Sequence, residues 1–125
     1  MSAAAPGAAP VNEYRRARRR KVEHPIEVLD TMTERVIGQL SDLSESGMLL
    51  IAHQPLTSDA LYQLRFRLPG GRNGADHVVE LGAHELWSDP AAAPGQIWTG
   101  FRFIDISPAD LAFVREWVSA GVPAI

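Results

Sequence analysis

The chain has 125 residues, of which 46% are hydrophobic and 22% are charged, a composition typical of one soluble globular domain. It contains no cysteine, which excludes disulfides, thiolate nucleophiles and cysteine-ligated zinc. No apolar run approaches the roughly 20 residues that a membrane helix needs, and the first ten residues lack the basic and apolar regions of a secretory signal. We therefore expect a single soluble, cytoplasmic domain.

The charges are distributed unevenly along the chain. Residues 1–21 carry five arginines and one lysine against a single glutamate, a balance of +5, whereas the remaining residues carry six arginines against fourteen acids, a balance of −8. The contrast predicts a basic arm that binds an anionic ligand or partner. The acidic body that follows argues against broad nucleic-acid binding.

The first 21 residues predict little regular structure. Residues 1–12 are rich in alanine, proline and glycine and predict a flexible tail. Residues 13–21 form a basic arm in which the like charges repel each other, so we expect it to be mobile without a partner.

From residue 22 onward the apolar residues alternate as they do in β-strands. The alternation predicts six short strands, near residues 26–28, 35–40, 47–52, 63–68, 77–87 and 97–103. The connections are rich in turn-forming residues; they include a polar turn at 41–46, the glycine-rich turn 69–74 and a loop at 88–96. The period of the fifth strand shifts near Gly82, which predicts a bulge or tight bend.

The last predicted element is an amphipathic helix over residues 108–120. Ser107 is suited to cap its first turn, Pro108 to open it, and Asp110 to face the positive end of its dipole. Because no helix lies between strands, an alternating α/β fold is excluded. We predict an all-β fold over residues 22–120, a small six-stranded antiparallel barrel with a C-terminal amphipathic helix and a flexible basic N-terminal arm.

The polar turn between the second and third strands offers a carboxylate and a hydroxyl. Asp42 and Ser44 are two residues apart, so on an extended chain they point the same way and could meet one ligand. The alternative is a plain hairpin turn, because aspartate, serine and glycine are favoured turn formers.

Five arginines in the basic arm offer a second set of ligand contacts: Arg15, Arg16, Arg18, Arg19 and Arg20. They could form a solvated tail or a nonspecific phosphate-binding arm. Arginine also donates two hydrogen bonds to the O6 and N7 edge of guanine and stacks on purine rings. A carboxylate such as Asp42 complements the opposite guanine edge, which carries N–H donors. Together these groups would recognise guanine and phosphate.

These motifs resemble those of the PilZ domain, a family that binds the bacterial second messenger cyclic di-GMP. The family pattern is RxxxR in a flexible N-terminal segment, followed by [D/N]xSxxG. Arg15 and Arg19 supply the first motif, and residues 42–47 (DLSESG) supply the second. Trp87 near the end of the fifth strand and the sequence GFRF at 100–103 add to the resemblance, which covers residues 13–118.

The resemblance implies a site between the arm and the DxSxxG turn. Arg15 and Arg19 would contact phosphate and the guanine edge, and Asp42 would accept hydrogen bonds from guanine. Ser44 would add a hydroxyl contact and Gly47 would allow close approach of the backbone. Arg16 and Arg20 also satisfy RxxxR, so the register stays open, and Arg16, Arg18 or Arg20 would supply auxiliary contacts.

The resemblance further implies a stand-alone receptor that senses one or two molecules of cyclic di-GMP and relays the signal to a partner protein. It is not expected to be an enzyme or to hold a cofactor or metal, since the four histidines are scattered and no nucleophile has a base beside it. The alternative is a PilZ-like scaffold that acts only through protein contacts. A small nucleic-acid-binding barrel is disfavoured by the acidic body.

Overall fold

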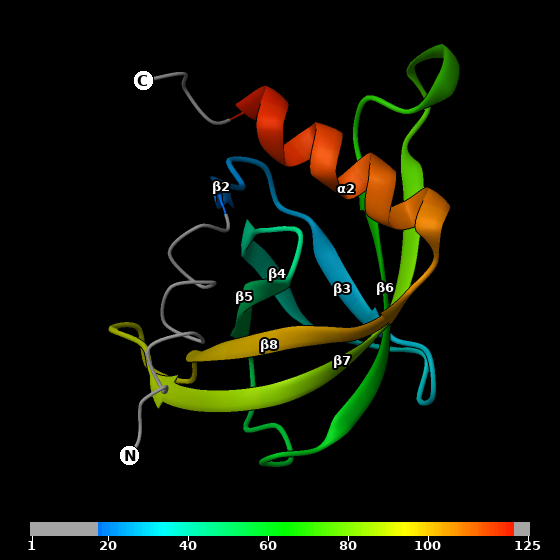
Figure 1. Cartoon of the computed structure of the whole chain (residues 1–125). Coiled ribbons are helices and arrows are strands. Elements are labelled where there is room, and N and C mark those ends of the chain that lie inside the picture. Colours follow the sequence, from blue (N-terminus) through cyan, green and yellow to red (C-terminus); the bar gives the residue numbers. More distant parts are fainter. Residues whose placement is uncertain (1–17, 122–125) are drawn as a thin grey trace, which may run out of the picture.

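Six antiparallel strands close into a barrel, and one helix lies across its end (Figure 1). The computed structural model describes residues 18–121. Neighbouring strands follow the order β4-β3-β6-β7-β8-β5, and pairing of β4 with β5 closes the barrel. The barrel strands are β3 (Glu27–Asp30), β4 (Arg35–Leu43), β5 (Gly47–Ala52), β6 (Leu61–Leu68), β7 (His77–Pro90) and β8 (Ile97–Ile106). The predicted barrel with a terminal helix is confirmed.

The core follows from the alternation in the sequence. On β6, Leu64, Phe66 and Leu68 are buried, as their period of two predicts. The helix α2 (Pro108–Gly121) adds its own buried residues to the core, namely Val114, Trp117 and Val118. Its N-terminus is capped as predicted, because the backbone N–H of Asp110 donates to the Ser107 hydroxyl over 3.1 Å.

The second predicted strand is longer than expected. We predicted that it ends at Leu40 and that Asp42 lies in a turn, but β4 continues to Leu43. The register against β5 shifts between Leu40 and Asp42, which marks a bulge at Ser41. The bulge lets both Leu40 and Leu43 reach the core, so burial of Leu43 outweighs the turn propensity of its polar neighbours. The turn that follows is Ser44–Gly47.

Two other predicted boundaries are also wrong. The end of the basic arm is not a free segment, since β2 (Arg20–Lys21) pairs with the end of β4. The fifth barrel strand extends past Trp87 to Pro90, because residues 88–90 pair with the start of β8. The connecting loop is therefore confined to residues 91–96.

Two local irregularities agree with the sequence. The β7–β8 register shifts between Gly82 and Ala83, where the pattern predicted a bulge. The glycine-rich turn contains the short 3-10 helix η1 (Arg72–Gly74), in which Asn73 has a φ of 56°. Asparagine tolerates this left-handed conformation better than most residues.

Candidate functional site

Successive arginines at the end of the basic arm point to different parts of the molecule. Arg19 contacts Asp42 of β4, while Arg18 and Arg20 both lie against α2. This alternation is what extended chain requires, because neighbouring side chains of a strand point in opposite directions. Pairing of β2 with β4 sets the direction of each side chain, with Lys21 opposite Asp42 and Arg20 opposite Leu43.

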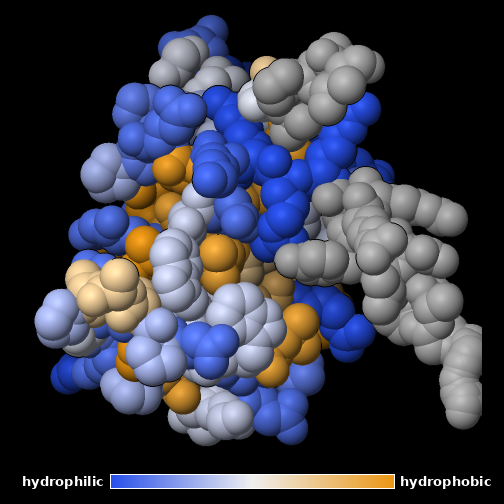
Figure 2. Space-filling model, turned by 90° about the vertical axis from the view of Figure 1, so that its left-hand side faces the viewer, coloured by the Kyte–Doolittle hydropathy of each residue, from blue (hydrophilic) through white to orange (hydrophobic). Residues whose placement is uncertain are grey.

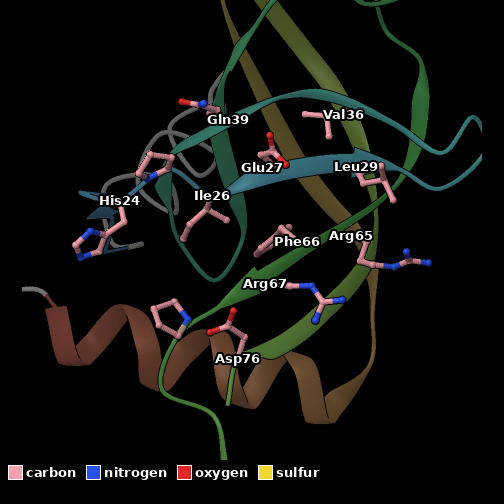
Figure 3. Close-up of a pocket in the computed structure, with 12 residues that line it drawn as sticks. His24, Ile26, Glu27, Leu29, Val36, Gln39, Arg65, Phe66, Arg67 and Asp76 are labelled. Carbon is pink, nitrogen blue, oxygen red and sulfur yellow. The ribbon is translucent and has the colours of Figure 1, made fainter. Parts of the chain in front are cut away.

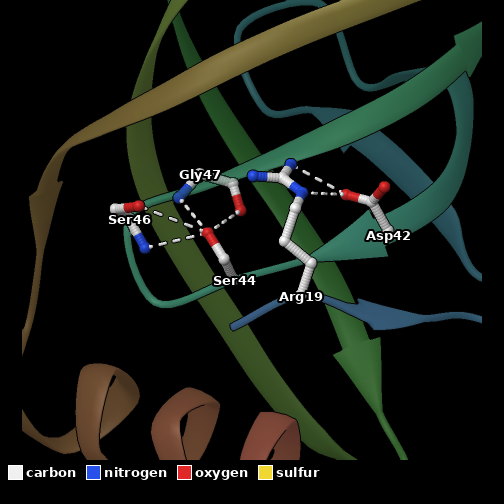
Figure 4. A network of polar contacts seen from close by, with 5 residues as sticks. All are labelled: Arg19, Asp42, Ser44, Ser46 and Gly47. Atoms are coloured by element: carbon white, nitrogen blue, oxygen red, sulfur yellow. Dashed lines mark hydrogen bonds and ion pairs between the residues drawn. The ribbon is translucent and has the colours of Figure 1, made fainter. Parts of the chain in front are cut away.

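Arg19 and Asp42 form an ion pair between the arm and the barrel wall (Figure 4). Nε of Arg19 donates to Oδ1 of Asp42 over 2.9 Å, and Nη2 lies 2.8 Å from the same oxygen. The two side chains remain 27% and 18% exposed, so a ligand can reach them. Oδ2 of Asp42 has no hydrogen-bond partner among residues 18–121. This oxygen can therefore accept a further hydrogen bond.

The hydroxyl of Ser44 serves the turn that follows β4. Ser44 is fully buried, and its Oγ accepts hydrogen bonds from the backbone N–H groups of Ser46 and Gly47 over 3.2 Å and 3.1 Å. The backbone N–H of Ser44 also donates to the carbonyl of Gly47 over 2.9 Å. Asp42 and Ser44 thus have separate partners, and Ser44 closes the turn (Figure 4).

Gly47 is required by the packing of β5 against β8. A Cβ at this position would lie 2.3 Å from the carbonyl oxygen of Phe101, far inside van der Waals contact. The backbone of Gly47 thus lies close to the backbone of β8, which a side chain would not allow. The DxSxxG motif divides into a carboxylate that faces the arm and two residues that shape the turn.

Arg20 is held by α2. Its Nη1 donates to the carbonyl of Trp117 over 2.7 Å, and its guanidinium carbon lies 3.7 Å from the centre of the Trp117 ring. The cation and the carbonyl both lie near the negative end of the helix dipole, an arrangement that stabilises the helix end. The other two arm residues of the predicted site, Arg15 and Arg16, lie outside the described residues.

Trp87 also belongs to this region, although in the sequence it contributed only to the family resemblance. A lateral row across the strands runs from Asp42 through Leu49 and Gly100 to Trp87. A Cβ at Gly100 would lie 2.4 Å from Nε1 of Trp87, so the indole covers the bare backbone of that glycine. Trp87 is 45% exposed. The sequence alone does not show that Trp87 lies opposite Gly100. This relation follows only from the pairing of β7 with β8.

The surface on this side of the molecule is chemically mixed. Figure 2 views the side of the molecule on which β2, β4 and β5 lie in Figure 1, and apolar atoms there are interrupted by hydrophilic side chains.

A separate groove of about 620 Å³ lies between β3 and β6 (Figure 3). It forms where the β3–β6 ladder ends, since the paired residues include only Leu29 with Arg65 and Asp30 with Leu64. Arg65 at its edge donates to Glu80 over 2.7 Å, and this hydrogen bond raises the pKa of Arg65. Of the predicted site residues that the structure describes, none lines the groove.

The described part of the chain offers neither a membrane-spanning helix nor a metal site. In residues 18–121 no helix is long and apolar enough to cross a membrane. The same residues contain no group of three or more histidine, aspartate or glutamate side chains arranged to hold a metal ion.

Comparison with solved structures shows the same fold. The Bacillus subtilis inhibitor of motility (MotI/DgrA) has a TM-score of 0.69 and 13% sequence identity; the alignment covers 84% of this chain and 49% of that one, so this chain spans about half its length. The PilZ domain of Escherichia coli YcgR with c-di-GMP has a TM-score of 0.60 and 16% identity, over 85% and 89% of the two chains. YcgR in complex with c-di-GMP has a TM-score of 0.64 and 18% identity, over 84% and 44%.

The sequence comparisons place the chain in a family. No curated protein matches it in sequence. The family model of the PilZ domain matches residues 13–120, which include both motifs, the barrel and nearly all of α2. The resemblance seen in the sequence is thereby confirmed, and the chain belongs to the PilZ domain family.

Proposed function

We propose that this protein is a receptor for cyclic di-GMP, which binds between the arginine arm and the barrel wall at β4. The ion pair between Arg19 and Asp42 carries this proposal. It joins a guanidinium, which can bond phosphate or the O6 and N7 edge of guanine, to a carboxylate that can accept from guanine N–H groups. Family membership and the c-di-GMP complexes of YcgR support the choice of ligand.

The contacts of the arginines favour one register of the RxxxR motif. Arg19 faces Asp42, whereas Arg20 is bonded to the Trp117 carbonyl and covers the Trp117 ring. We therefore assign the motif to Arg15 and Arg19. In this assignment Arg20 anchors the arm to α2, and Arg18 stays an auxiliary arginine.

Trp87 provides a flat surface for a base in the same row as Asp42. Neighbouring strands lie about 4.8 Å apart, so the three steps from β4 to β7 span about 14 Å. A ligand with two purines is large enough to use both ends of such a row. Base stacking on an exposed indole contributes about 1–3 kcal/mol, which is comparable to one bidentate guanine contact.

Binding involves no bond cleavage, so the protein acts as a sensor whose output is a change in contacts with a partner protein. Closure of the arm over the ligand would change the surface that β2 and α2 present.

Isothermal titration with cyclic di-GMP tests the proposal, with GTP and cyclic di-AMP as competitors. We expect saturable, guanine-selective binding that Arg19→Ala and Asp42→Ala each weaken about tenfold or more. Arg72→Ala is the control, because Arg72 is exposed in η1 on a different turn. Absence of binding by the folded wild-type protein would refute the receptor and favour a scaffold that acts through protein contacts alone.

A further inference from the structure

A small pocket adjoins the predicted site on the side of the helix. It has a volume of about 270 Å³ and is lined by Arg18, Glu45, Arg115, Val118 and Ser119. Arg18 comes from the basic arm, Glu45 from the turn of the DxSxxG motif, and the other three from α2. The pocket therefore lies where the arm, the motif turn and the helix meet.

Arg115 is the residue of this pocket best suited to hold an anion. Its Nε donates to Oε2 of Glu45 over 2.5 Å, which fixes the orientation of the guanidinium. That contact uses one of five N–H donors, and the four donors on Nη1 and Nη2 have no partner among residues 18–121. The side chain is 60% exposed, so these donors can reach a ligand.

The chemistry of the pocket favours phosphate over a base. The described lining residues include two guanidinium groups and one carboxylate, which gives them a net positive charge in an otherwise acidic body. Val118 supplies an apolar wall, and among residues 18–121 the lining includes no aromatic side chain on which a base could stack. The volume is several times the roughly 30 Å³ of one water molecule, enough for a phosphate group.

The pocket lies near the C-terminal end of α2, whose carbonyl groups repel a negative ligand. Arg20 donates to the Trp117 carbonyl and adds a positive charge at this end, which offsets part of the repulsion. Arg20 thus stabilises the helix end, while Arg18 and Arg115 remain available.

We propose that this pocket is the phosphate subsite of the cyclic di-GMP site, with Arg115 and Arg18 as its donors and Glu45 as the residue that positions Arg115. The inference rests on the proposed function, and it adds α2 to the ligand-binding surface. Binding would then tie the arm to the helix through one phosphate group.

The experiment compares Arg115→Ala, Arg115→Lys and Arg72→Ala by calorimetry with cyclic di-GMP, and follows the ligand by ³¹P NMR. Arg115→Ala should weaken binding about tenfold, because hydrogen bonds to charged groups are the strong ones. Arg115→Lys should recover part of this loss, because it keeps the charge but not the planar fork. Arg72→Ala removes the same charge elsewhere and should leave affinity unchanged.

The ³¹P signal separates a phosphate contact from an indirect effect. We expect the phosphorus shift on binding to decrease in the Arg115→Ala complex and to stay as in wild type in the Arg72→Ala complex. If Arg115→Ala binds cyclic di-GMP with wild-type affinity and an unchanged ³¹P shift, the phosphate subsite is refuted. The proposal that the protein is a cyclic di-GMP receptor would be unaffected. Absence of binding by wild type would overturn both proposals.

Discussion

Replacement of Gly47 by alanine tests whether the glycine of the motif serves the barrel or the ligand. The added Cβ would lie 2.3 Å from the carbonyl oxygen of Phe101, whereas ordinary contact begins at 3.4 Å. The obstacle is backbone of β8, which cannot rotate away as a side chain can. Strands β5 and β8 must therefore separate by about 1 Å at a point where six residue pairs hold them together.

The cost of this separation has two parts. Overpacking in a tight interior costs about 1–3 kcal/mol, and the loss of one backbone hydrogen bond adds about 1 kcal/mol. The lower unfolded-state entropy of alanine opposes them by less than about 1 kcal/mol. We expect Gly47→Ala to reduce the free energy of unfolding by about 1–4 kcal/mol, which lowers Tm by about 4–16 °C in a domain of this size.

Urea unfolding followed by fluorescence and circular dichroism measures this change, and calorimetry on the folded fraction measures cyclic di-GMP affinity. The reasoning requires a large loss of stability with modest loss of affinity in molecules that still fold. A variant as stable as wild type that no longer binds ligand would refute it, because Gly47 would then contact the ligand and not β8.

Three further substitutions separate the roles of neighbouring residues. Gly100→Ala meets the indole of Trp87 and not backbone, so we expect a stability loss below about 1 kcal/mol but weaker cyclic di-GMP binding by calorimetry, as the ring is displaced. Ser44→Ala leaves the turn N–H groups without their acceptor, and urea unfolding should show a loss of about 1–3 kcal/mol. Arg20→Ala removes a hydrogen bond and a cation–π contact with Trp117, and urea unfolding should show that the free energy of unfolding falls by about 1–2 kcal/mol. Wild-type stability of the Ser44→Ala or Arg20→Ala variant would contradict the role assigned to that residue.

Much of the fold could be predicted because its signals are local. The alternation on β6, the capping serine before α2 and the turn residues at 69–74 depend on neighbours within a few positions, and the structure confirms them. Strand ends were less predictable. The extension of β4 through Asp42 depends on burial of Leu43, and burial is a property of the closed barrel.

For the candidate site, the sequence by itself determined which residue types are present: a run of arginines, and the Asp42, Ser44 and Gly47 of one motif. It could not assign a direction to each arginine, because the alternation of Arg18, Arg19 and Arg20 depends on the pairing of β2 with β4.

Only the tertiary structure decided which distant residues meet. Arg115 and Glu45 are 70 positions apart in the chain, and Trp87 reaches the row of Asp42 through two intervening strands. A local pattern specifies the conformation of a segment, but long-range contacts depend on how the barrel closes. In the closed barrel, Ser44 and Gly47 of the DxSxxG motif shape the turn, whereas the carboxylate of Asp42 faces the arm.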